Sequence, residues 1–466
     1  MPDTATEARA PSPARPKASL RLRLAPDVWL ARDADRAVLV RWPRSRALER
    51  WDVSTEELLT QLGTPEGVEV DPGLLSGGPA LRGTNLPEQL LDEGWLTITV
   101  VTGSIPGFTV IPRRQPPHRR LQSVSEPALS RHTVLVPVDS GWRLEAPHSW
   151  CDIHFSDLEE ARRCLEDMGN GDLEGQVLLW CGVLIDASEE QERLSHRQWS
   201  THELWFHERS RRYGRERNFG GTFWARGTFT PPPLRPEEAS AVTVHFGAVD
   251  TEDLNARSMS LHRALEDRRS VRRHNDDAPL DRERLGEFLH RTARLRLVHE
   301  VDGVEYGSKP YPSGGSVYET EIYLLVRHVR GLAAGLWRYD AAEHGLVPIR
   351  KGLSDPDVAA LLREAAHSST VDAPPQVTVL MAPRFGRILW KYEQMGYAVM
   401  LKHVGVLMQT MYLVATDMGL AACSIGSGDS DLFSRATGLD PLECTSVGEF
   451  LLGTPHPDES FQERPA

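Results

Sequence analysis

Two short segments of the sequence carry residue types that can grip a phosphorylated ligand. The run Arg268-Arg269-Ser270-Val271-Arg272 combines three arginines with a hydroxyl, and such a set holds phosphate through charge-assisted hydrogen bonds. The run Pro312-Ser313-Gly314-Gly315 follows, and its two glycines would let the backbone lie close to a flat ligand. Together the segments predict a site for a phosphorylated, planar cofactor. The arginine run by itself is more typical of a solvated helix face.

Helices and strands must position these segments. Leu261 and Leu265 share one face of a helix that is predicted before the arginine run, and a second helix is predicted from Asp281. Buried strands are predicted over 318–326, 335–340 and 377–381.

A long helix is predicted over 390–418, and it is apolar on most of its surface. We therefore expect it to be deeply buried, with its methionines in the core rather than in a cofactor site. Gly419 would end this helix, and residues 425–429 form a glycine-containing loop that could approach the edge of a ligand.

Residues 258–455 resemble the flavin-dependent nitroreductase superfamily. Within it they are most similar to the SagB-type azoline dehydrogenases of thiazole/oxazole-modified peptide pathways. The two segments above match flavin motifs, residues 335–340 match a hairpin of the subgroup, and Lys391-Tyr392 falls where the subgroup has a Lys-Tyr pair. The C-terminal pattern also fits, at Gly405, Gln409, Leu413, Gly419, Leu420 and Gly426.

The resemblance implies FMN as the cofactor and a homodimer with FMN at its interface. Arg268 and Ser270 would hold the phosphate and ribityl chain. Arg272 would lie near the N1/O2 edge, where a cation stabilises the charge of reduced flavin. Ser313, Gly314 and Gly315 would approach the cofactor, often from the second subunit, and the backbone of Gly426 and Ser427 would lie near flavin N5. The other implied cofactor contacts are Arg269, Pro312 and Gln409.

The implied reaction removes one proton and one hydride from an azoline ring and leaves an azole, and dioxygen would reoxidise the flavin. Tyr392 is the candidate base, with Lys391 as its activator, because a nearby cation lowers the pKa of a phenol. Lys391 is the alternative base if burial lowers its own pKa. Two positions depart from the subgroup: His403-Val404-Gly405-Val406 replaces a Glu-x-Gly-His run, and Thr410 stands where asparagine is common. These departures concern the lining of the substrate pocket.

The N-terminal half predicts two small domains ahead of the FMN domain at 256–466. Residues 1–18 read as a disordered tail. Alternating Leu20, Leu22 and Leu24 and a helix near residue 54 resemble, over 19–102, the winged-helix-like modules that recognise leader peptides. A proline- and arginine-rich linker is predicted over 106–127, and a second small recognition-like domain over 131–240. The predicted fold class is therefore α+β, with a C-terminal nitroreductase-like FMN domain preceded by small winged-helix-like peptide-recognition domains.

Within the second small domain, strands are predicted over 132–138 and 176–185 and a helix over 157–168. His202 and His207 flank Trp205 and Phe206 but are five residues apart, whereas a zinc protease needs two histidines at i and i+4. We expect no metal site there and expect Trp205 and Phe206 to pack in a core. Residues 231–233 are three prolines, which predict a hinge.

Composition narrows the classes of function. The chain has 466 residues and a net charge of -13, which disfavours a general nucleic-acid binder. No apolar run approaches a membrane span, and five cysteines without a CxxC pair predict a reduced, cytoplasmic location.

The resemblance predicts an FMN-dependent azoline dehydrogenase that acts on a ribosomally made precursor peptide, with a cyclodehydratase complex as a further partner. Two alternatives stay open. One is an NAD(P)H-dependent nitro- or quinone reductase of the same fold, which the large N-terminal half argues against. The other is a non-catalytic peptide-binding scaffold subunit.

Overall fold

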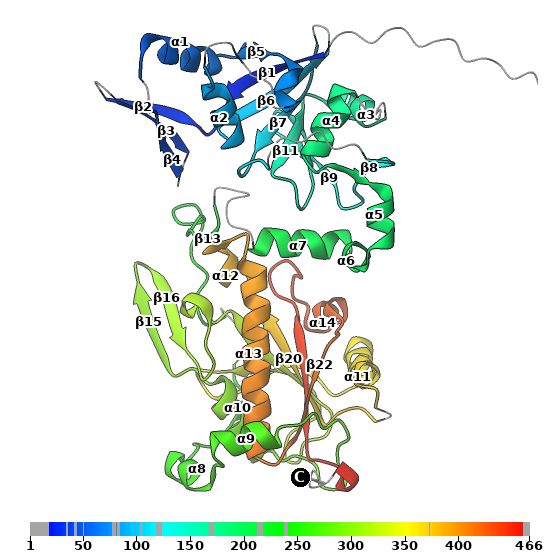
Figure 1. Cartoon of the computed structure of the whole chain (residues 1–466). Coiled ribbons are helices and arrows are strands. Elements are labelled where there is room, and N and C mark those ends of the chain that lie inside the picture. Colours follow the sequence, from blue (N-terminus) through cyan, green and yellow to red (C-terminus); the bar gives the residue numbers. More distant parts are fainter. Residues whose placement is uncertain are drawn as a thin grey trace, which may run out of the picture. The chain divides into compact units, whose positions relative to one another are not determined.

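The computed structural model divides the chain into two compact units, residues 1–217 and residues 218–466 (Figure 1). Each unit is described by itself. The described residues are 18–33, 36–41, 44–49, 51–76, 81, 84–102, 105–117, 124–166, 172–211, 218–236, 241–371 and 373–459. The predicted tail over residues 1–18 lies almost wholly outside these ranges.

The first unit is built on a seven-stranded antiparallel sheet in the order β5-β1-β6-β7-β11-β10-β9. The predicted alternation holds in its first strand, where Leu20 and Leu22 are fully buried. The strands are β1 (Ala18–Leu24), β5 (Val68–Val70), β6 (Leu96–Thr102), β7 (Ile105–Pro112), β9 (Val134–Val138), β10 (Gly141–Glu145) and β11 (Cys151–Phe155).

Helices and small sheets surround this main sheet. Asp52 caps the first helix through a hydrogen bond from the Thr55 backbone N–H of 2.9 Å. The helices are α1 (Val53–Leu62), α2 (Leu86–Asp92), α3 (Leu158–Glu166), α4 (Leu173–Trp180), α5 (Ala187–Glu192), α6 (Leu194–Arg197) and α7 (Thr201–Arg211), with the short 3-10 helix η1 (Pro72–Ser76). The smaller sheets pair β2 (Trp29–Asp33), β3 (Arg36–Arg41) and β4 (Arg44–Ala47), and separately β8 (Pro127–Leu129) with β12 (Leu184–Asp186).

The structure corrects the predicted division of this half of the chain. Strand β7 occupies most of the first half of the predicted linker over 106–127 and pairs with β6 and β11. One sheet therefore crosses both predicted small domains, and they form one unit. The first half of the apolar run 176–185 is helix α4 rather than a strand, and its last two residues begin β12. Phe206 is 41% exposed although Trp205 is buried.

The second unit is also built on a seven-stranded antiparallel sheet, in the order β14-β19-β18-β17-β20-β23-β22. The three predicted strands are confirmed as β17, β18 and β20. The strands are β14 (Val244–His245), β17 (Thr320–Val326), β18 (Gly335–Asp340), β19 (Gly345–Lys351), β20 (Val377–Pro383), β22 (Ala421–Ile425) and β23 (Gly448–Gly453).

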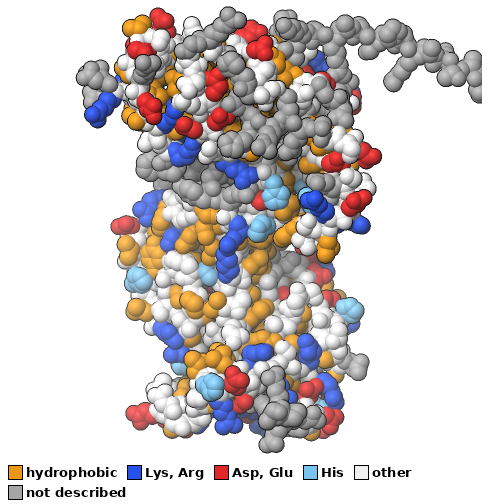
Figure 2. All heavy atoms as spheres, viewed as in Figure 1, with side chains coloured by type: hydrophobic (Ala, Val, Ile, Leu, Met, Phe, Trp, Pro, Cys, Tyr) orange, Lys and Arg blue, Asp and Glu red, His pale blue; other side chains and the backbone are white. Residues whose placement is uncertain are grey.

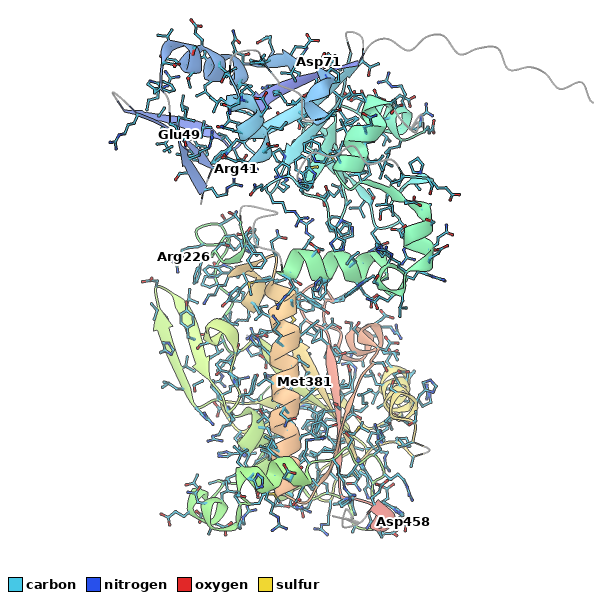
Figure 3. The ribbon with its side chains drawn as sticks, viewed as in Figure 1. Arg41, Glu49, Asp71, Arg226, Met381 and Asp458 are labelled. Carbon is cyan, nitrogen blue, oxygen red and sulfur yellow. The ribbon has the colours of Figure 1, made fainter. Side chains whose placement is uncertain are left out.

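Helices cover both faces of this sheet, because its central strands are apolar on both sides. In β17, Ile322 and Leu324 pack with helices α10 (Arg282–Ala293) and α13 (Gly396–Asp417). The alternate residues Tyr323 and Leu325 pack with α11 (Pro356–Ser369) and α14 (Ser430–Thr437) on the other face. Met381 of β20 belongs to the α13 face, and Figure 3 shows it beneath that helix.

Helix α13 is shorter than predicted. Residues 385–389 form a separate helix, α12 (Phe385–Leu389), and β21 (Tyr392–Glu393) lies between the two. By length and composition alone α13 could cross a membrane, but 44% of its most apolar window is buried inside the unit. Its Met400, Leu407 and Met411 are fully buried, so they are core residues as predicted.

The remaining elements of the second unit are short. They are β13 (Gly220–Gly221), α8 (Thr251–Arg257), α9 (Leu261–Asp267), the hairpin β15 (Leu297–Val301) and β16 (Val304–Ser308), η2 (Gly314–Ser316) and η3 (Pro457–Glu459). Residues 218–236 belong to this unit, although the sequence placed them in the second small domain. The three prolines over 231–233 pack here, since Arg387 donates a 2.6 Å hydrogen bond to the Pro232 carbonyl.

Candidate functional site

The Ser313-Gly314-Gly315 segment forms a tight turn before strand β17. Gly315 has φ +62, a conformation that glycine adopts without strain. The Ser313 hydroxyl accepts a 3.1 Å hydrogen bond from the Tyr318 backbone N–H. The Gly314 N–H donates a 2.6 Å hydrogen bond to His403 Nε2. The turn is thus held from within and from helix α13.

Lys391 and Tyr392 lie directly against this turn. A Cβ atom at Gly315 would overlap Lys391 Nζ and would lie 2.8 Å from the Tyr392 hydroxyl oxygen. The fold therefore brings the predicted flavin segment and the predicted catalytic pair together, although they are far apart in the sequence. The absence of a side chain at Gly315 makes this approach possible.

The Lys391 ammonium is surrounded by aromatic rings. Its Nζ lies 4.9 Å from the Phe223 ring centre, 5.5 Å from that of Tyr306 and 5.4 Å from that of Tyr392. Phe223 belongs to residues 218–236, which we call the strap. The strap is fixed to this site because β13 pairs with β21, and the Phe223 N–H donates a 3.0 Å hydrogen bond to the Lys391 carbonyl.

Burial shifts the pKa values of the pair in opposite directions. Desolvation lowers the pKa of Lys391 below its ordinary 10.5. Desolvation, followed by the negative charges of Glu319 and ionised Tyr306, raises the pKa of Tyr392 above 10. The expectation that Lys391 lowers the Tyr392 pKa is wrong, because burial and neighbouring negative charge dominate. Of the two candidates for the base, these directions favour Lys391.

The arginine run lies at the other end of α13. Arg268 ends α9, and its guanidinium lies over the Tyr412 ring, 5.3 Å from the centre. The Ser270 hydroxyl is 2.9 Å from the Tyr412 hydroxyl, which also accepts a 2.7 Å hydrogen bond from the Ser424 N–H. Within the described ranges, the structure records no ion pair for Arg268 or Arg272.

The other predicted contacts differ in their surroundings. Arg269 donates a hydrogen bond to the Glu459 carbonyl, so it braces the C-terminal segment. Arg272, Gln409 and Pro312 are exposed. Because Arg268 and Arg272 have no acidic partner among the described residues and Ser270 is exposed between them, this donor set fits a phosphate group.

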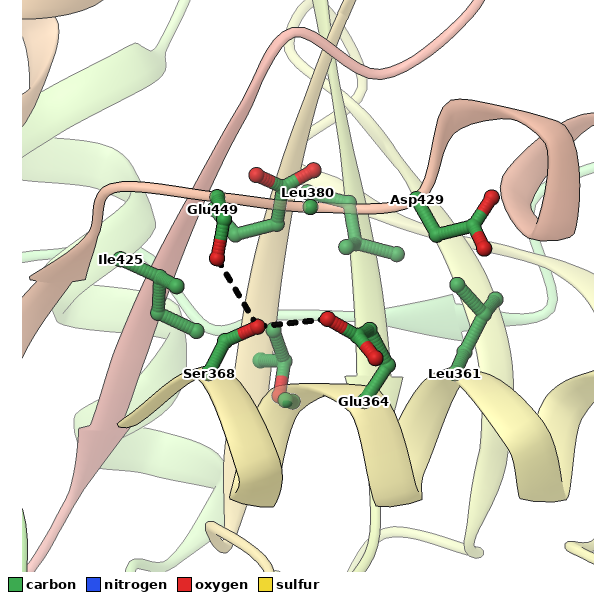
Figure 4. Close-up of a pocket in the computed structure, with 11 residues that line it drawn as sticks. Leu361, Glu364, Ser368, Leu380, Ile425, Asp429 and Glu449 are labelled. Atoms are coloured by element: carbon green, nitrogen blue, oxygen red, sulfur yellow. Dashed lines mark hydrogen bonds between the residues drawn. The ribbon is translucent and has the colours of Figure 1, made fainter. Parts of the chain in front are cut away.

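Gly426 and Ser427 form the loop that follows β22. The Ser427 hydroxyl donates a 3.0 Å hydrogen bond to Ser368 of α11, and Ser368 donates one of 2.6 Å to Glu364 (Figure 4). Ser427, Ser368 and Glu364 line a pocket together with Glu449 (Figure 4). A Cβ atom at Gly428 would overlap its carboxylate, so the loop lies directly against an acidic side chain.

Apart from the Gly426–Ser427 loop, predicted cofactor residues form two clusters along α13 within one chain. Gly314 contacts His403 near the start of α13, whereas Ser270 contacts Tyr412 near its end. Nine residues separate these contacts on the helix, or about 14 Å along its axis. Apolar side chains between and beside the clusters are exposed by 37% to 66%, namely Leu261, Leu265, Tyr397, Leu401 and Val406. Figure 2 shows hydrophobic side chains on the face that carries α13.

Four residues of the site were not predicted from the sequence as functional. His403 was noted only as a departure, and Glu319, Phe223 and Tyr306 carried no motif. The described residues include no group of three His, Cys, Asp or Glu side chains suited to a metal ion.

Gly315→Ala tests the contact between the turn and the catalytic pair. We expect it to lower the free energy of unfolding by more than Gly352→Ala does. Both positions have a left-handed φ, of +62 and +74, so both substitutions cost about 1–2 kcal/mol of backbone strain. Only at Gly315 would the added Cβ collide with neighbouring side chains, those of Lys391 and Tyr392, because nothing lies within 4 Å of a Cβ at Gly352. Equal losses of unfolding free energy in the two variants, measured by urea denaturation, would contradict the contact between Gly315 and the catalytic pair.

Glu449→Gln tests the environment of the Gly426–Gly428 loop. Burial, and then the Glu364 charge, raise the pKa of Glu449 from 4.5 to about 7 against an opposing hydrogen bond from Ser446. A raised folded-state pKa contributes stability below pH 4.5 that is lost as the pH rises through 7. We therefore expect the free energy of unfolding of Glu449→Gln to match that of the wild type at pH 4.5 and to exceed it by about 3 kcal/mol at pH 8. Exposed Glu443→Gln is the control, and a pH-independent difference for Glu449→Gln would refute the burial.

Comparison with known proteins identifies the family. The nitroreductase family model matches residues 265–450. The nitroreductase MJ1384 of Methanocaldococcus jannaschii is 31% identical over 158 residues, which are 33% of this chain and 78% of that protein. The microcin B17-processing protein McbC of Escherichia coli is 28% identical over 137 residues, 28% of this chain and 49% of McbC, so the match spans about half of McbC.

Two solved structures also match part of the chain at low sequence identity. A nitroreductase of Ralstonia eutropha JMP134 has 19% identity and a TM-score of 0.36, and covers 50% of this chain and 96% of that one. The E. coli microcin synthetase McbBCD complex with truncated pro-MccB17 bound matches with 20% identity and a TM-score of 0.34, over 50% of this chain and 91% of that one. The family model and the Methanocaldococcus jannaschii relative show that the mixed α/β chain carries a nitroreductase-like domain at its C-terminal end, and that the protein belongs to the nitroreductase family of oxidoreductases.

Proposed function

We propose that the protein is an FMN-dependent dehydrogenase of the SagB type, which oxidises azoline rings in a ribosomally made precursor peptide to azoles. The approach of Lys391 and Tyr392 to Gly315 of the predicted flavin segment carries this proposal. The similarity to McbC, a protein named for processing microcin B17, supports a peptide substrate. A nitro- or quinone reductase has no evident need for a proton-abstracting pair at this position.

The residues present fit FMN in two respects. Arg268, Arg272 and Ser270 would hold its phosphate, since they offer two cations and a hydroxyl at the surface. Gly315 is exposed and has no side chain, so its backbone could approach the edge of a flat ring system, with Lys391 and Tyr392 beside it. When bound, FMN would accept a hydride from the substrate ring and pass the electrons to dioxygen, giving hydrogen peroxide.

The pair beside the turn would handle the proton. The azoline Cα–H is acidified by the neighbouring carbonyl and C=N bond, so a modest base suffices. Lys391 in its amine form would take this proton, and its lowered pKa enlarges the fraction of amine at neutral pH. Tyr392 keeps its proton because burial raises its pKa, so it would orient the substrate by donating a hydrogen bond. One proton and one hydride leave, and the ring becomes aromatic.

Several further assignments belong to this proposal. The apolar residues exposed on α9 and α13 would be covered by a second copy of the chain, which gives a homodimer. The first unit would bind the leader part of the precursor peptide, and a cyclodehydratase would supply the azolines. The protein would work in the cytoplasm.

A stopped-flow experiment separates the proposal from its main alternative. Purified protein is expected to be yellow with bound FMN, and an azoline-bearing peptide should bleach the flavin under anaerobic conditions. NADH and NADPH should bleach it far more slowly. Rapid bleaching by NAD(P)H without response to the peptide would favour a reductase, and colourless protein that binds the peptide would favour a scaffold.

A further inference from the structure

His403 connects helix α13 to the flavin-segment turn through two hydrogen bonds, one buried and one partly buried. Its Nδ1 lies 2.7 Å from Glu319 Oε1, and its Nε2 accepts the 2.6 Å hydrogen bond from the Gly314 N–H. The His403 side chain is only 8% exposed and that of Glu319 only 1%. Buried polar groups of this kind are costly to leave unpaired, so the geometry of the three groups is tightly coupled.

The direction of these hydrogen bonds defines one tautomer. A backbone N–H can only donate, so His403 Nε2 must be the unprotonated nitrogen. Nδ1 then carries the hydrogen and donates it to the Glu319 carboxylate. A histidine protonated on Nε2 would place two N–H donors against each other at 2.6 Å.

Glu319 reaches the same turn by a second route. Its other oxygen, Oε2, is 3.4 Å from the Ser313 hydroxyl, which in turn accepts the Tyr318 N–H. One buried carboxylate therefore supports Ser313 directly and Gly314 through His403. The next residue, Gly315, is the one that lies against Lys391 and Tyr392.

The charge of Glu319 also acts on Tyr392, one residue of the catalytic pair. It is the second cause, after burial, of the raised Tyr392 pKa. The other charged groups packed around Glu319 have partners of their own. Arg384 pairs with Glu321 at 3.1 Å, Arg387 donates to the Val317 carbonyl at 2.8 Å, and Lys309 Nζ is 3.4 Å from the Thr320 carbonyl.

We propose that Glu319 and His403 are a positioning pair, in which the Nδ1–H tautomer of His403 fixes the Gly314–Gly315 turn for FMN and for Lys391 and Tyr392. This inference rests on the proposed function. It also assigns a role to His403, the first residue of the segment 403–406 in which the chain departs from the SagB-type pattern.

Two substitutions at position 403 separate positioning from simple packing. His403→Leu fills the space but cannot accept the Gly314 N–H, so we expect FMN affinity of the apoprotein to fall about ten- to hundredfold. His403→Gln offers an amide oxygen to Gly314 and an amide N–H to Glu319, and should keep affinity within about threefold. His202→Leu, at an exposed position on α7, is the control. Thermal unfolding of each apoprotein shows whether the variant is folded.

Two spectroscopic measurements do not depend on the reaction. Nitrogen NMR of histidine-labelled apoprotein, assigned by loss of signal in His403→Gln, should show Nδ1 protonated and Nε2 bare. Glu319→Gln should lower the pKa of Tyr392 in an ultraviolet phenolate titration, with Tyr392→Phe identifying the signal.

An Nε2–H tautomer, or His403→Leu protein that is folded and binds FMN as tightly as the wild type, would overturn the pairing. Neither result would contradict the proposed oxidation of azolines. Conversely, absence of azole formation with the expected tautomer would remove the proposed function and leave the pairing in place.

Discussion

Lys391→Ala is expected to lower the rate of azole formation by about 10²- to 10⁴-fold, the range for loss of a general base. FMN should stay bound, because Lys391 lies beside the turn and not in the arginine cluster. Lys391→Arg should be nearly as inactive, since a guanidinium stays protonated. Single-turnover flavin bleaching with an azoline peptide measures the effect.

Tyr392→Phe should be less severe if the phenol orients the substrate and does not take the proton. A loss of about tenfold is the expectation for one missing hydrogen bond.

The wild-type rate should rise with pH through a pKa below the ordinary 10.5 of lysine, because burial lowers the Lys391 pKa. Lys351→Ala, at an exposed strand end, is the control. Full activity of Lys391→Ala would remove this residue from the mechanism.

Subunit mixing is expected to restore activity to two inactive variants, Arg268→Ala and Lys391→Ala. The two residues lie at opposite ends of α13 in one chain, so the proposal draws each FMN site from two chains. A mixed dimer would then have one site with both residues intact. Co-expression in equal amounts should give about a quarter of the wild-type rate, since half of randomly paired dimers are mixed.

Arg268→Ala mixed with Ser270→Ala is the matched control, because both changes fall in the same cluster and no site is intact. Recovery in the control would show that neither variant was truly inactive. No recovery in the Arg268–Lys391 mixture, with mixed dimers demonstrated by tagged subunits, would place both clusters in a site formed by one chain.

The sequence predicted the parts of the second unit that depend on local pattern. Apolar runs predicted strands β17, β18 and β20, because strands covered on both faces carry apolar side chains on each face. It was less reliable where short apolar runs suit either structure. Residues 176–185 were predicted as a strand, and the structure has helix α4 over the first five of them.

The site residues that the sequence missed are those that depend on tertiary contact. Glu319 and His403 are 84 residues apart, and nothing in either local pattern indicates that they are paired. Phe223 comes from a segment predicted to belong to another domain, yet it packs on Lys391. The direction of the Tyr392 pKa shift likewise depends on burial and on Glu319, neither of which the Lys-Tyr motif contains.

The most direct test of the central claim is the mass of an azoline-bearing precursor peptide after incubation with the FMN-loaded protein in air. The account predicts a loss of about 2 Da per ring, one H₂ by stoichiometry, with hydrogen peroxide formed in equal amount. An unchanged peptide mass, under conditions in which NAD(P)H reduces the bound flavin rapidly, would contradict it.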